Sequence, residues 1–359
     1  MAPMAAQISH MLAGEEALRR ALGVPGADCL GPAAAAFAFG CQGPDIFYHN
    51  QRTKPSGLHY GSLAHRRRSG TLVASMAGAL SPGERRPDNP AGAYVLGLAT
   101  HAALDRATHP FVICFSGWLD PAEPSTLRRR GCHPFLERLL DACLLERSLG
   151  LSPADYGPAK RMGIGSPEAT ALDSVLVAPW AAGLRSAFPK AASLDSLLEA
   201  RVANALADAR GFFALTDPAT TDAGRGIKLS KLGADEARYV ISVIYPLRVP
   251  EGMDPMNESR SEWPHPSGDG RSSRASYPEL VREGAEEAAR AVGLVGSFWR
   301  GELAAESLAE SLGEGPLALR DAKGEAAVPR VCRPLALPEA IDAELAERLA
   351  REPGSSAAR

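Results

Sequence analysis

Residues that bind metal ions recur at helical spacing near residue 100. His101, Asp105 and His109 follow one another at intervals of four residues. Each residue of an α-helix turns by about 100°, so these three side chains share one stripe of a helix surface. Imidazole nitrogens and a carboxylate in such a row suit a borderline cation such as Zn²⁺. The same spacing also produces ordinary His–Asp pairs on a polar helix face, and the triplet alone leaves that alternative open.

A second pair of the same kind follows at His133 and Glu137, and seven of the eight histidines lie within the first 133 residues. Asp45 follows a Gly-Pro turn, where a carboxylate can bind a metal or simply cap the next turn. His10 falls on the first amphipathic segment, where a lone histidine can equally be a core or surface residue. Two helices with a His-x-x-x-carboxylate pair make a metal site the preferred interpretation.

The candidate metal ligands are expected to lie mainly on helices. Asn89 and Pro90 are typical of a helix start, and the apolar stretch after them runs to His109 and Pro110. Long segments have helical periodicity and alternating strands are scarce, which predicts an all-α fold in the form of a multi-helix bundle around the metal site. Further helices are expected near residues 8–22, 63–80, 134–148, 169–187, 194–213 and 277–298. Residues 239–245 fit either a short strand or a buried helix segment.

Two regions look different from the helical body. Residues 250–276 form a long loop rich in Gly, Pro and Ser, and loops of that length are usually functional. From residue 313 the chain is rich in Gly, Glu, Ala and Pro and ends in a polar helix-like piece and a tail. We therefore expect a helical domain with the metal site in residues 1–312 and a partly flexible C-terminal extension, without chemistry of its own, in residues 313–359.

Composition excludes several classes of protein. The 359 residues are 45% hydrophobic and carry a net charge of −3, as in ordinary globular proteins and unlike a dedicated nucleic-acid binder. No apolar run approaches the roughly 18 residues that span a bilayer. The first residues have no basic start and no long apolar stretch, so a cytoplasmic location is expected. Six irregularly spaced cysteines fit reduced thiols rather than a disulfide framework.

These motifs together resemble the zinc-dependent phospholipase C family, in particular a bacterial, intracellular-looking branch, and more distantly the single-strand-specific zinc nucleases. The resemblance rests on the order and spacing of the histidines and carboxylates, on Gly61-Ser62-Leu63-Ala64-His65, and on Tyr94-Val95-Leu96-Gly97-Leu98-Ala99-Thr100-His101. It extends over roughly residues 5–295 and implies a mostly helical fold with two or three zinc ions.

The resemblance implies eight metal ligands: His10, Asp45, His65, His101, Asp105, His109, His133 and Glu137. It further implies that His109, His133 and Glu137 share one ion. Asp45, His65, His101 and Asp105 would hold another, with His10 and a bridging Asp105 at a third. In secreted members the processed N-terminus also binds a metal, whereas here Met1 lies nine residues before His10. His59 is an alternative to His65 as a metal ligand. Both His59 and His49 are also candidates to support a metal ligand or to lie beside the substrate.

The implied activity is hydrolysis of a phosphoric ester, as by a phospholipase C-like phosphodiesterase, through a zinc-activated water that Asp45 orients or deprotonates. The substrate would be a phosphate ester such as a phospholipid head group, with the oligomeric state left open. Two alternatives remain. One is a nuclease or nucleotidase on the same fold, with Phe47, Tyr48 or Tyr60 stacking a base. The other is a zinc-binding protein that does not hydrolyse a substrate.

Overall fold

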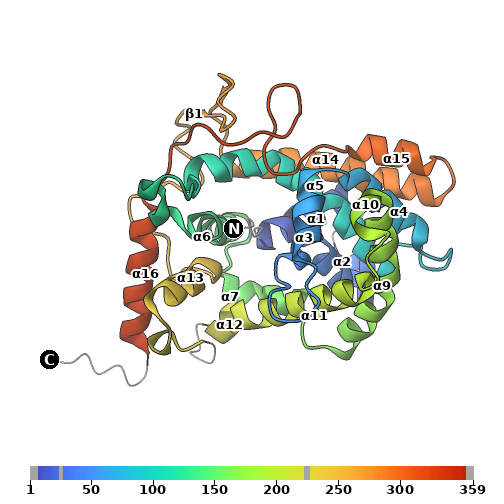
Figure 1. The fold of residues 1–359 in the computed structure, drawn as a ribbon, viewed down its shortest axis with the longest axis horizontal. Helices are drawn as coiled ribbons and strands as arrows, with labels where there is room; N and C mark the ends of the chain where they lie inside the picture. Colours follow the sequence, from blue (N-terminus) through green and yellow to red (C-terminus); the bar gives the residue numbers. More distant parts are fainter. Residues whose placement is uncertain (1–6, 24–26, 222–226, 353–359) are drawn as a thin grey trace.

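The structure, a computed structural model, describes residues 7–23, 27–221 and 227–352, with only the backbone for residues 27–29. Within these ranges the regular structure is helical except for a two-stranded antiparallel sheet of β1 (Trp263–Pro264) and β2 (Ser272–Ser273), in which Trp263 lies opposite Ser273. The prediction of an all-α fold is therefore confirmed (Figure 1).

The first half of the described chain holds α1 (Gln7–Leu22), η1 (Ala27–Ala33), α2 (Ala34–Gly40), η2 (Gly43–Phe47), α3 (Leu58–Arg66), α4 (Ser69–Ala79), α5 (Pro90–Ser116), η3 (Pro124–Arg129), α6 (Cys132–Leu149), α7 (Pro153–Tyr156), α8 (Pro158–Arg161) and α9 (Pro167–Ala187). The second half holds α10 (Pro189–Ala192), α11 (Leu198–Thr216), α12 (Pro218–Thr221), η4 (Leu229–Lys231), α13 (Ala234–Val243), α14 (Tyr277–Trp299), α15 (Ala305–Leu312) and α16 (Leu337–Arg351). Elements named η are short 3-10 helices.

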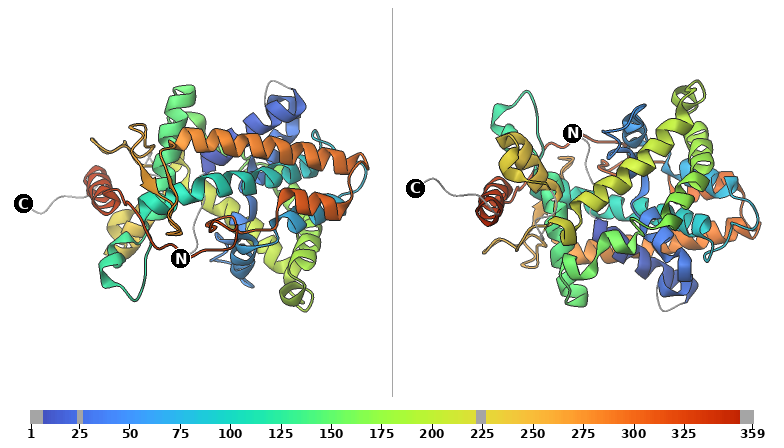
Figure 2. Two further views of the ribbon diagram at one scale, coloured as in Figure 1. Left: turned by 90° about the horizontal axis from the view of Figure 1, so that it is seen from above. Right: turned by 90° about the horizontal axis from the view of Figure 1, so that it is seen from below.

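Helix α5 is the central element of the fold. Its start is as the sequence predicts, because the Asn89 side chain accepts hydrogen bonds from the backbone N–H groups of Ala91 at 2.9 Å and Gly92 at 3.4 Å. Helix α14 runs alongside α5, α1 packs against both, and α2 crosses the first half of α5 (Figure 2). Nearly every side chain of α5 is buried, so this helix is surrounded by other elements.

Two hydrophobic clusters meet along α5. Tyr94, Val95 and Leu98 belong to a cluster with α2, α4, α9 and α11, where the Trp180 Nε1–H donates a 3.0 Å hydrogen bond to the Tyr94 hydroxyl. Further along α5, Phe111 and its neighbours join a second cluster formed with α6, α13, α14 and α16. The His101–His109 stretch lies at the junction of the two clusters, and both clusters fix its orientation.

The crossing of α2 and α5 depends on glycine at two positions where the backbones touch. A Cβ atom at Gly97 would lie 2.3 Å from the Phe37 carbonyl oxygen, and one at Gly40 would lie 2.2 Å from the Tyr94 carbonyl oxygen. Atoms of a rigid backbone cannot move away cheaply, so these glycines set the distance between the two helices.

We predict that Gly97→Ala lowers the free energy of unfolding by about 1–3 kcal/mol, because the added methyl group forces the helices apart. Urea unfolding measures this value. Gly293→Ala in α14 is the matched control, since nothing lies within 4 Å of its Cβ position. It should be neutral or stabilise the helix by up to about 1 kcal/mol. Equal effects of the two substitutions would contradict the close crossing.

The sequence prediction for the end of α5 is wrong. The helix was expected to stop at His109 and Pro110 but continues to Ser116. An internal proline costs about 3 kcal/mol because it lacks an N–H group. Continuing the helix buries Phe111 and Phe115 in the second hydrophobic cluster. Each buried side chain contributes roughly 1.5–3 kcal/mol, which offsets the cost of the proline.

Two further boundaries differ from the sequence prediction, and of the two alternatives for residues 239–245 the structure shows a helix over residues 239–243. The helix expected over residues 63–80 is two helices, α3 and α4, because Arg68 has a left-handed backbone with φ 66° and its N–H group donates to the Glu314 carbonyl. Residues 239–243 are helical, as part of α13, because their apolar side chains pack against α6 and α16. The helix expected to begin at residue 194 begins at Leu198.

The segment after α15 hydrogen-bonds to the helical body. The Leu317 N–H group donates to the His65 carbonyl at 2.8 Å, and the Arg333 N–H group donates to the Cys114 carbonyl at 2.9 Å. Helix α16 packs on α13 and α6. The division into residues 1–312 and 313–359 stays a prediction, and the expected tail at 354–359 lies outside the described residues.

The described cysteine side chains, Cys41, Cys114, Cys132, Cys143 and Cys332, form no disulfide with one another. None of the helices in the described ranges has the length and apolar character required to cross a lipid bilayer.

Candidate metal centre

Three neighbouring groups of side chains could each hold a metal ion, and in every group the candidate ligand atoms lie within 4.8 Å of one another. The groups are His10, His101 and Asp105; Asp45, His65 and His101; and His109, His133 and Glu137. All eight residues that the sequence suggested as ligands are brought together in this way. They come from five elements: α1, η2, α3, α5 and α6.

Asp105 links the groups. Its Oδ1 lies 3.2 Å from the His10 Nε2, and its Oδ2 lies 3.2 Å from the His101 Nε2 and 3.7 Å from the His65 Nε2. The His65 Nε2 is also 2.9 Å from the Asp45 Oδ1. The rings of His10 and His101 stack with centroids 4.4 Å apart. One carboxylate therefore faces imidazoles from three separate helices.

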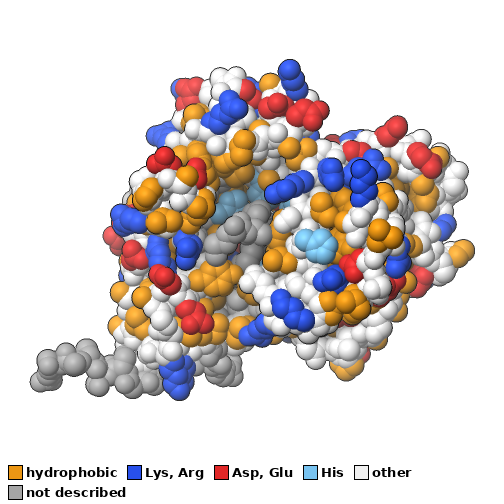
Figure 3. All heavy atoms as spheres, viewed as in Figure 1, with side chains coloured by type: hydrophobic (Ala, Val, Ile, Leu, Met, Phe, Trp, Pro, Cys, Tyr) orange, Lys and Arg blue, Asp and Glu red, His pale blue; other side chains and the backbone are white. Residues whose placement is uncertain are grey.

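The third group lies next along α5. The His109 Nδ1 is 3.7 Å from the Asp105 Oδ2, whereas its Nε2 is 3.7 Å from the Glu137 Oε1. The Glu137 Oε1 lies 3.3 Å from the His133 Nε2. The His133 side chain is 20% exposed, whereas the other side chains of the three groups are at most 5% exposed. The centre therefore approaches solvent at His133, and histidine side chains are visible within a hollow of the molecular surface (Figure 3).

Several buried polar atoms of these side chains have no hydrogen-bond partner among the described residues. They are His10 Nδ1, His101 Nε2, Asp105 Oδ2, His109 Nδ1, His133 Nε2 and Glu137 Oε2. A buried polar atom without a partner costs about 1–3 kcal/mol. A metal ion would satisfy such atoms at once, so the arrangement fits a cation better than a hydrogen-bonded network.

Backbone carbonyls set the orientation of two of the imidazole rings. The His65 Nδ1 lies 2.8 Å from the Gly61 carbonyl oxygen, and the His101 Nδ1 lies 3.1 Å from the Cys41 carbonyl oxygen. A carbonyl oxygen only accepts, so each Nδ1 carries the hydrogen and donates it. The Nε2 lone pairs of the neutral rings then face the centre, as metal binding requires.

Glycine at position 43 allows the turn before Asp45 to pass close to His101. Gly43 has φ +56°, and a Cβ atom there would lie 2.2 Å from Cγ of the His101 ring. Any larger residue would strain the backbone and displace that imidazole. Glycine at position 43 is therefore required by the packing of His101 in the centre and not only by the turn.

The electrostatic environment keeps the carboxylates ionised. Burial alone would raise the pKa of Asp105, but its interactions with His101, His109 and His10 hold that pKa well below its usual range. Burial alone would lower the pKa of His109, but the charges of Asp105 and Glu137 raise it to about 9. In the absence of a cation, protons on imidazoles therefore compensate the carboxylates, and a metal ion would displace those protons.

Sequence reasoning missed Asp141, which positions α1 in the centre. Its carboxylate accepts hydrogen bonds from the Ile8 N–H at 2.9 Å, from the Ser9 N–H and Oγ at 2.7 Å each, and from the Tyr245 hydroxyl at 3.1 Å. It thus caps the first turn of the helix that carries His10. The sequence does contain a pattern that points to Asp141, because this residue continues the four-residue spacing of His133 and Glu137.

The two further histidines considered from the sequence do not join the three groups. His59 is exposed, with its ring 3.9 Å from that of Tyr60. His49 is buried, stacks on Phe212 at 4.0 Å, and has its pKa lowered to about 3 by burial. Between His59 and His65, the structure brings only His65 into contact with Asp45 and Asp105. A role for His49 or His59 beside the substrate stays a prediction.

The fold and the site define an all-α protein with a buried His, Asp and Glu centre that could hold a metal ion. Comparisons with models of protein families, with curated protein sequences and with solved structures find no match.

Proposed function

We propose that this protein is a zinc-dependent phosphoric ester hydrolase, similar to a phospholipase C-like phosphodiesterase. The observation that carries the proposal is the juxtaposition of three groups with three ligand atoms each, two of which share His101. Zinc in structural sites is closed by four protein ligands, whereas catalytic zinc keeps a position for water or substrate. Three ligands in a group leave that position open.

The donor set supports zinc over magnesium or calcium. Five imidazoles and three carboxylates make up the three groups. Hard cations such as Mg²⁺ and Ca²⁺ take oxygen ligands, whereas imidazole nitrogen suits zinc and other transition metals. Asp105 faces His10, His65, His101 and His109 within 3.7 Å, which suits a carboxylate that bridges ions. Two or three zinc ions are proposed on this ground.

Zinc, when bound, would polarise the phosphoryl oxygens and lower the pKa of a water molecule towards about 7. Side chains of the protein have specific roles in the proposed hydrolysis. Asp45 orients the attacking water and accepts its proton, for which its ionised form is required. The interaction with His65 holds the pKa of Asp45 below its usual value despite burial. His133, the most exposed of the eight, lies where a phosphate ester would enter.

The test is metal analysis of untagged protein together with turnover of bis-p-nitrophenyl phosphate and p-nitrophenyl phosphorylcholine. We expect bound zinc, and loss of at least about 100-fold of the turnover after chelation, with recovery on adding zinc. His265→Asn is the matched control, because His265 bonds to Ser267 at 2.7 Å and belongs to none of the three groups. Bound zinc with no turnover of either ester would favour a non-hydrolytic zinc protein and overturn the proposal.

A further inference from the structure

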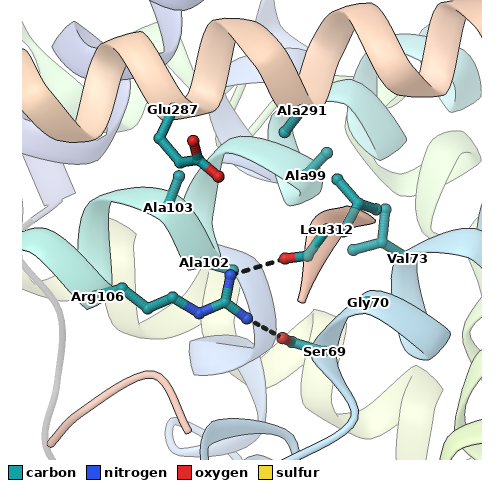
Figure 4. Close-up of a pocket in the computed structure, with 10 residues that line it drawn as sticks. All are labelled: Ser69, Gly70, Val73, Ala99, Ala102, Ala103, Arg106, Glu287, Ala291 and Leu312. Carbon is teal, nitrogen blue, oxygen red and sulfur yellow. Dashed lines mark hydrogen bonds between the residues drawn. The ribbon is translucent and has the colours of Figure 1, made fainter. Parts of the chain in front are cut away.

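A pocket lined by arginines lies between α5, α14 and the segment that follows α15. Its volume is about 340 Å³, and its charged wall residues are three arginines and two glutamates: Arg106 of α5, Glu283, Glu287 and Arg290 of α14, and Arg320 of the C-terminal segment. None of the eight residues of the metal centre lines it. Arg106 and Glu287 also line a narrower inner pocket beside Ser69 and Leu312 (Figure 4).

Arg106 lines both pockets, and its hydrogen-bond partners are neutral groups. Its Nη1 donates to the Leu312 carbonyl at 2.8 Å, and its Nη2 donates to the Ser69 Oγ at 2.7 Å (Figure 4). The Nη2 also donates to the Gly313 carbonyl at 2.9 Å. Its Nε is buried and has no hydrogen-bond partner. Among the described residues the two nearby carboxylates pair with other arginines, Glu314 with Arg68 and Glu287 with Arg290. The partly buried Arg106 side chain therefore has neutral hydrogen-bond partners and no ion pair of its own with a described carboxylate.

Arg320 adds a second positive charge with no ion-pair partner within the ranges described. Its side chain is half-buried at the wall of the pocket. Glu287 cannot serve as a full counter-ion, because it binds Arg290 through both of its oxygens.

We propose that this pocket binds a phosphate group, held between Arg106 and Arg320. The Arg320 guanidinium can form paired, charge-assisted hydrogen bonds to two phosphate oxygens. Arg106, whose Nη2 hydrogens are both donated within the protein, adds its positive charge and the second hydrogen of Nη1. The volume lies within the range of small-ligand sites, so it admits either inorganic phosphate or a small phosphomonoester. The site is separate from the metal centre and does not depend on the hydrolase function.

A bound phosphate would join α5 to the C-terminal segment. Asp105 of the metal centre precedes Arg106 in the chain, and Leu317 of the segment donates to the His65 carbonyl at 2.8 Å. The phosphate would therefore brace α5, which carries candidate metal ligands, against a segment that hydrogen-bonds to the His65 backbone of α3. It would act on the centre by holding these elements in place, without contact to a reacting atom.

Isothermal titration of the full-length protein with inorganic phosphate tests the site. We expect saturable binding that Arg320→Gln weakens at least about 10-fold, because a bidentate charged contact is lost. Arg320→Lys should retain part of the affinity. Arg300→Gln, at an arginine paired with Glu302 at 2.7 Å outside the pocket, is the control and should leave the affinity unchanged.

A parallel titration with glycerol 3-phosphate distinguishes the two sources of phosphate. Tighter binding of the ester, abolished by Arg320→Gln, identifies a phosphomonoester as the ligand, and equal or weaker binding identifies inorganic phosphate. Phosphate that binds the metal centre is insensitive to Arg320, so failure of the hydrolase proposal does not alter this result. Unchanged phosphate affinity in Arg320→Gln, or no saturable binding to the wild-type protein, would overturn the proposed site.

Discussion

On the proposed function, Asp105→Asn should remove the bound metal and lower hydrolytic turnover by at least about 100-fold. Asp105 lies within 3.7 Å of imidazole nitrogens from His10, His65 and His101 and also faces His109. An asparagine side chain has the same shape but neither the charge nor the second oxygen acceptor that a bridging ligand needs. Because outer-shell substitutions alone cost about 10–100-fold in metal affinity or activity, loss of a shared ligand should cost more.

The measurement is the molar ratio of bound metal, by mass spectrometry of the purified variant, alongside turnover of bis-p-nitrophenyl phosphate. Asp173→Asn is a matched control, because Asp173 forms an ion pair with Arg210 at 2.7 Å away from the three groups. It should keep the wild-type ratio and turnover. His133→Asn, which changes a partly exposed ligand with less effect on the core, provides a second test if Asp105→Asn folds poorly. A wild-type metal ratio in both variants would exclude these residues as ligands.

Asp141→Ala is expected to lower the free energy of unfolding by about 3–5 kcal/mol. The substitution removes the acceptor for the N–H groups of Ile8 and Ser9 and for the Tyr245 hydroxyl, all of which are buried. It also leaves buried Arg138, 3.9 Å away, without its nearby negative charge. Removing one partner of a buried charged network is costly, because the remaining groups keep their desolvation penalty.

Urea unfolding followed by circular dichroism measures this loss. Ser166→Ala is the control for an ordinary helix cap, since the Ser166 Oγ accepts from the Ala169 N–H at 3.2 Å near the protein surface. That substitution should cost only about 1 kcal/mol. An Asp141→Ala cost no larger than the Ser166→Ala cost would show that the network around α1 contributes little. Metal affinity should fall together with stability in Asp141→Ala, because α1 carries His10.

Local sequence patterns predict most helices because they depend on neighbouring residues. Asn89 and Pro90 define the start of α5 through an N-cap and a proline at the first helical position, and the structure confirms both. The end of α5 could not be predicted in this way. Pro110 is a stop signal in isolation, and only the tertiary packing of Phe111 and Phe115 makes continuation of the helix favourable.

The grouping of candidate ligands within one helix could also be predicted from the sequence. The four-residue spacing places His101, Asp105 and His109 on one stripe, and the same rule places His133 and Glu137 together. Contacts between ligands on different elements could not be predicted from spacing. For these contacts, the resemblance to a known family was the basis of the expectation. The role of Asp141 was missed because its partners are more than 100 residues away in the chain.

Local residue patterns suffice to predict the all-α class, the start of the central helix and the two stripes of candidate ligands, because each follows from residues within a few turns of one another. Packing between elements places His65 rather than His59 against Asp105, requires glycine at position 43, and puts Arg106 and Arg320 in the wall of one pocket. These outcomes depend on distances between elements. Such distances are set by how helices pack around α5, and no local pattern encodes them.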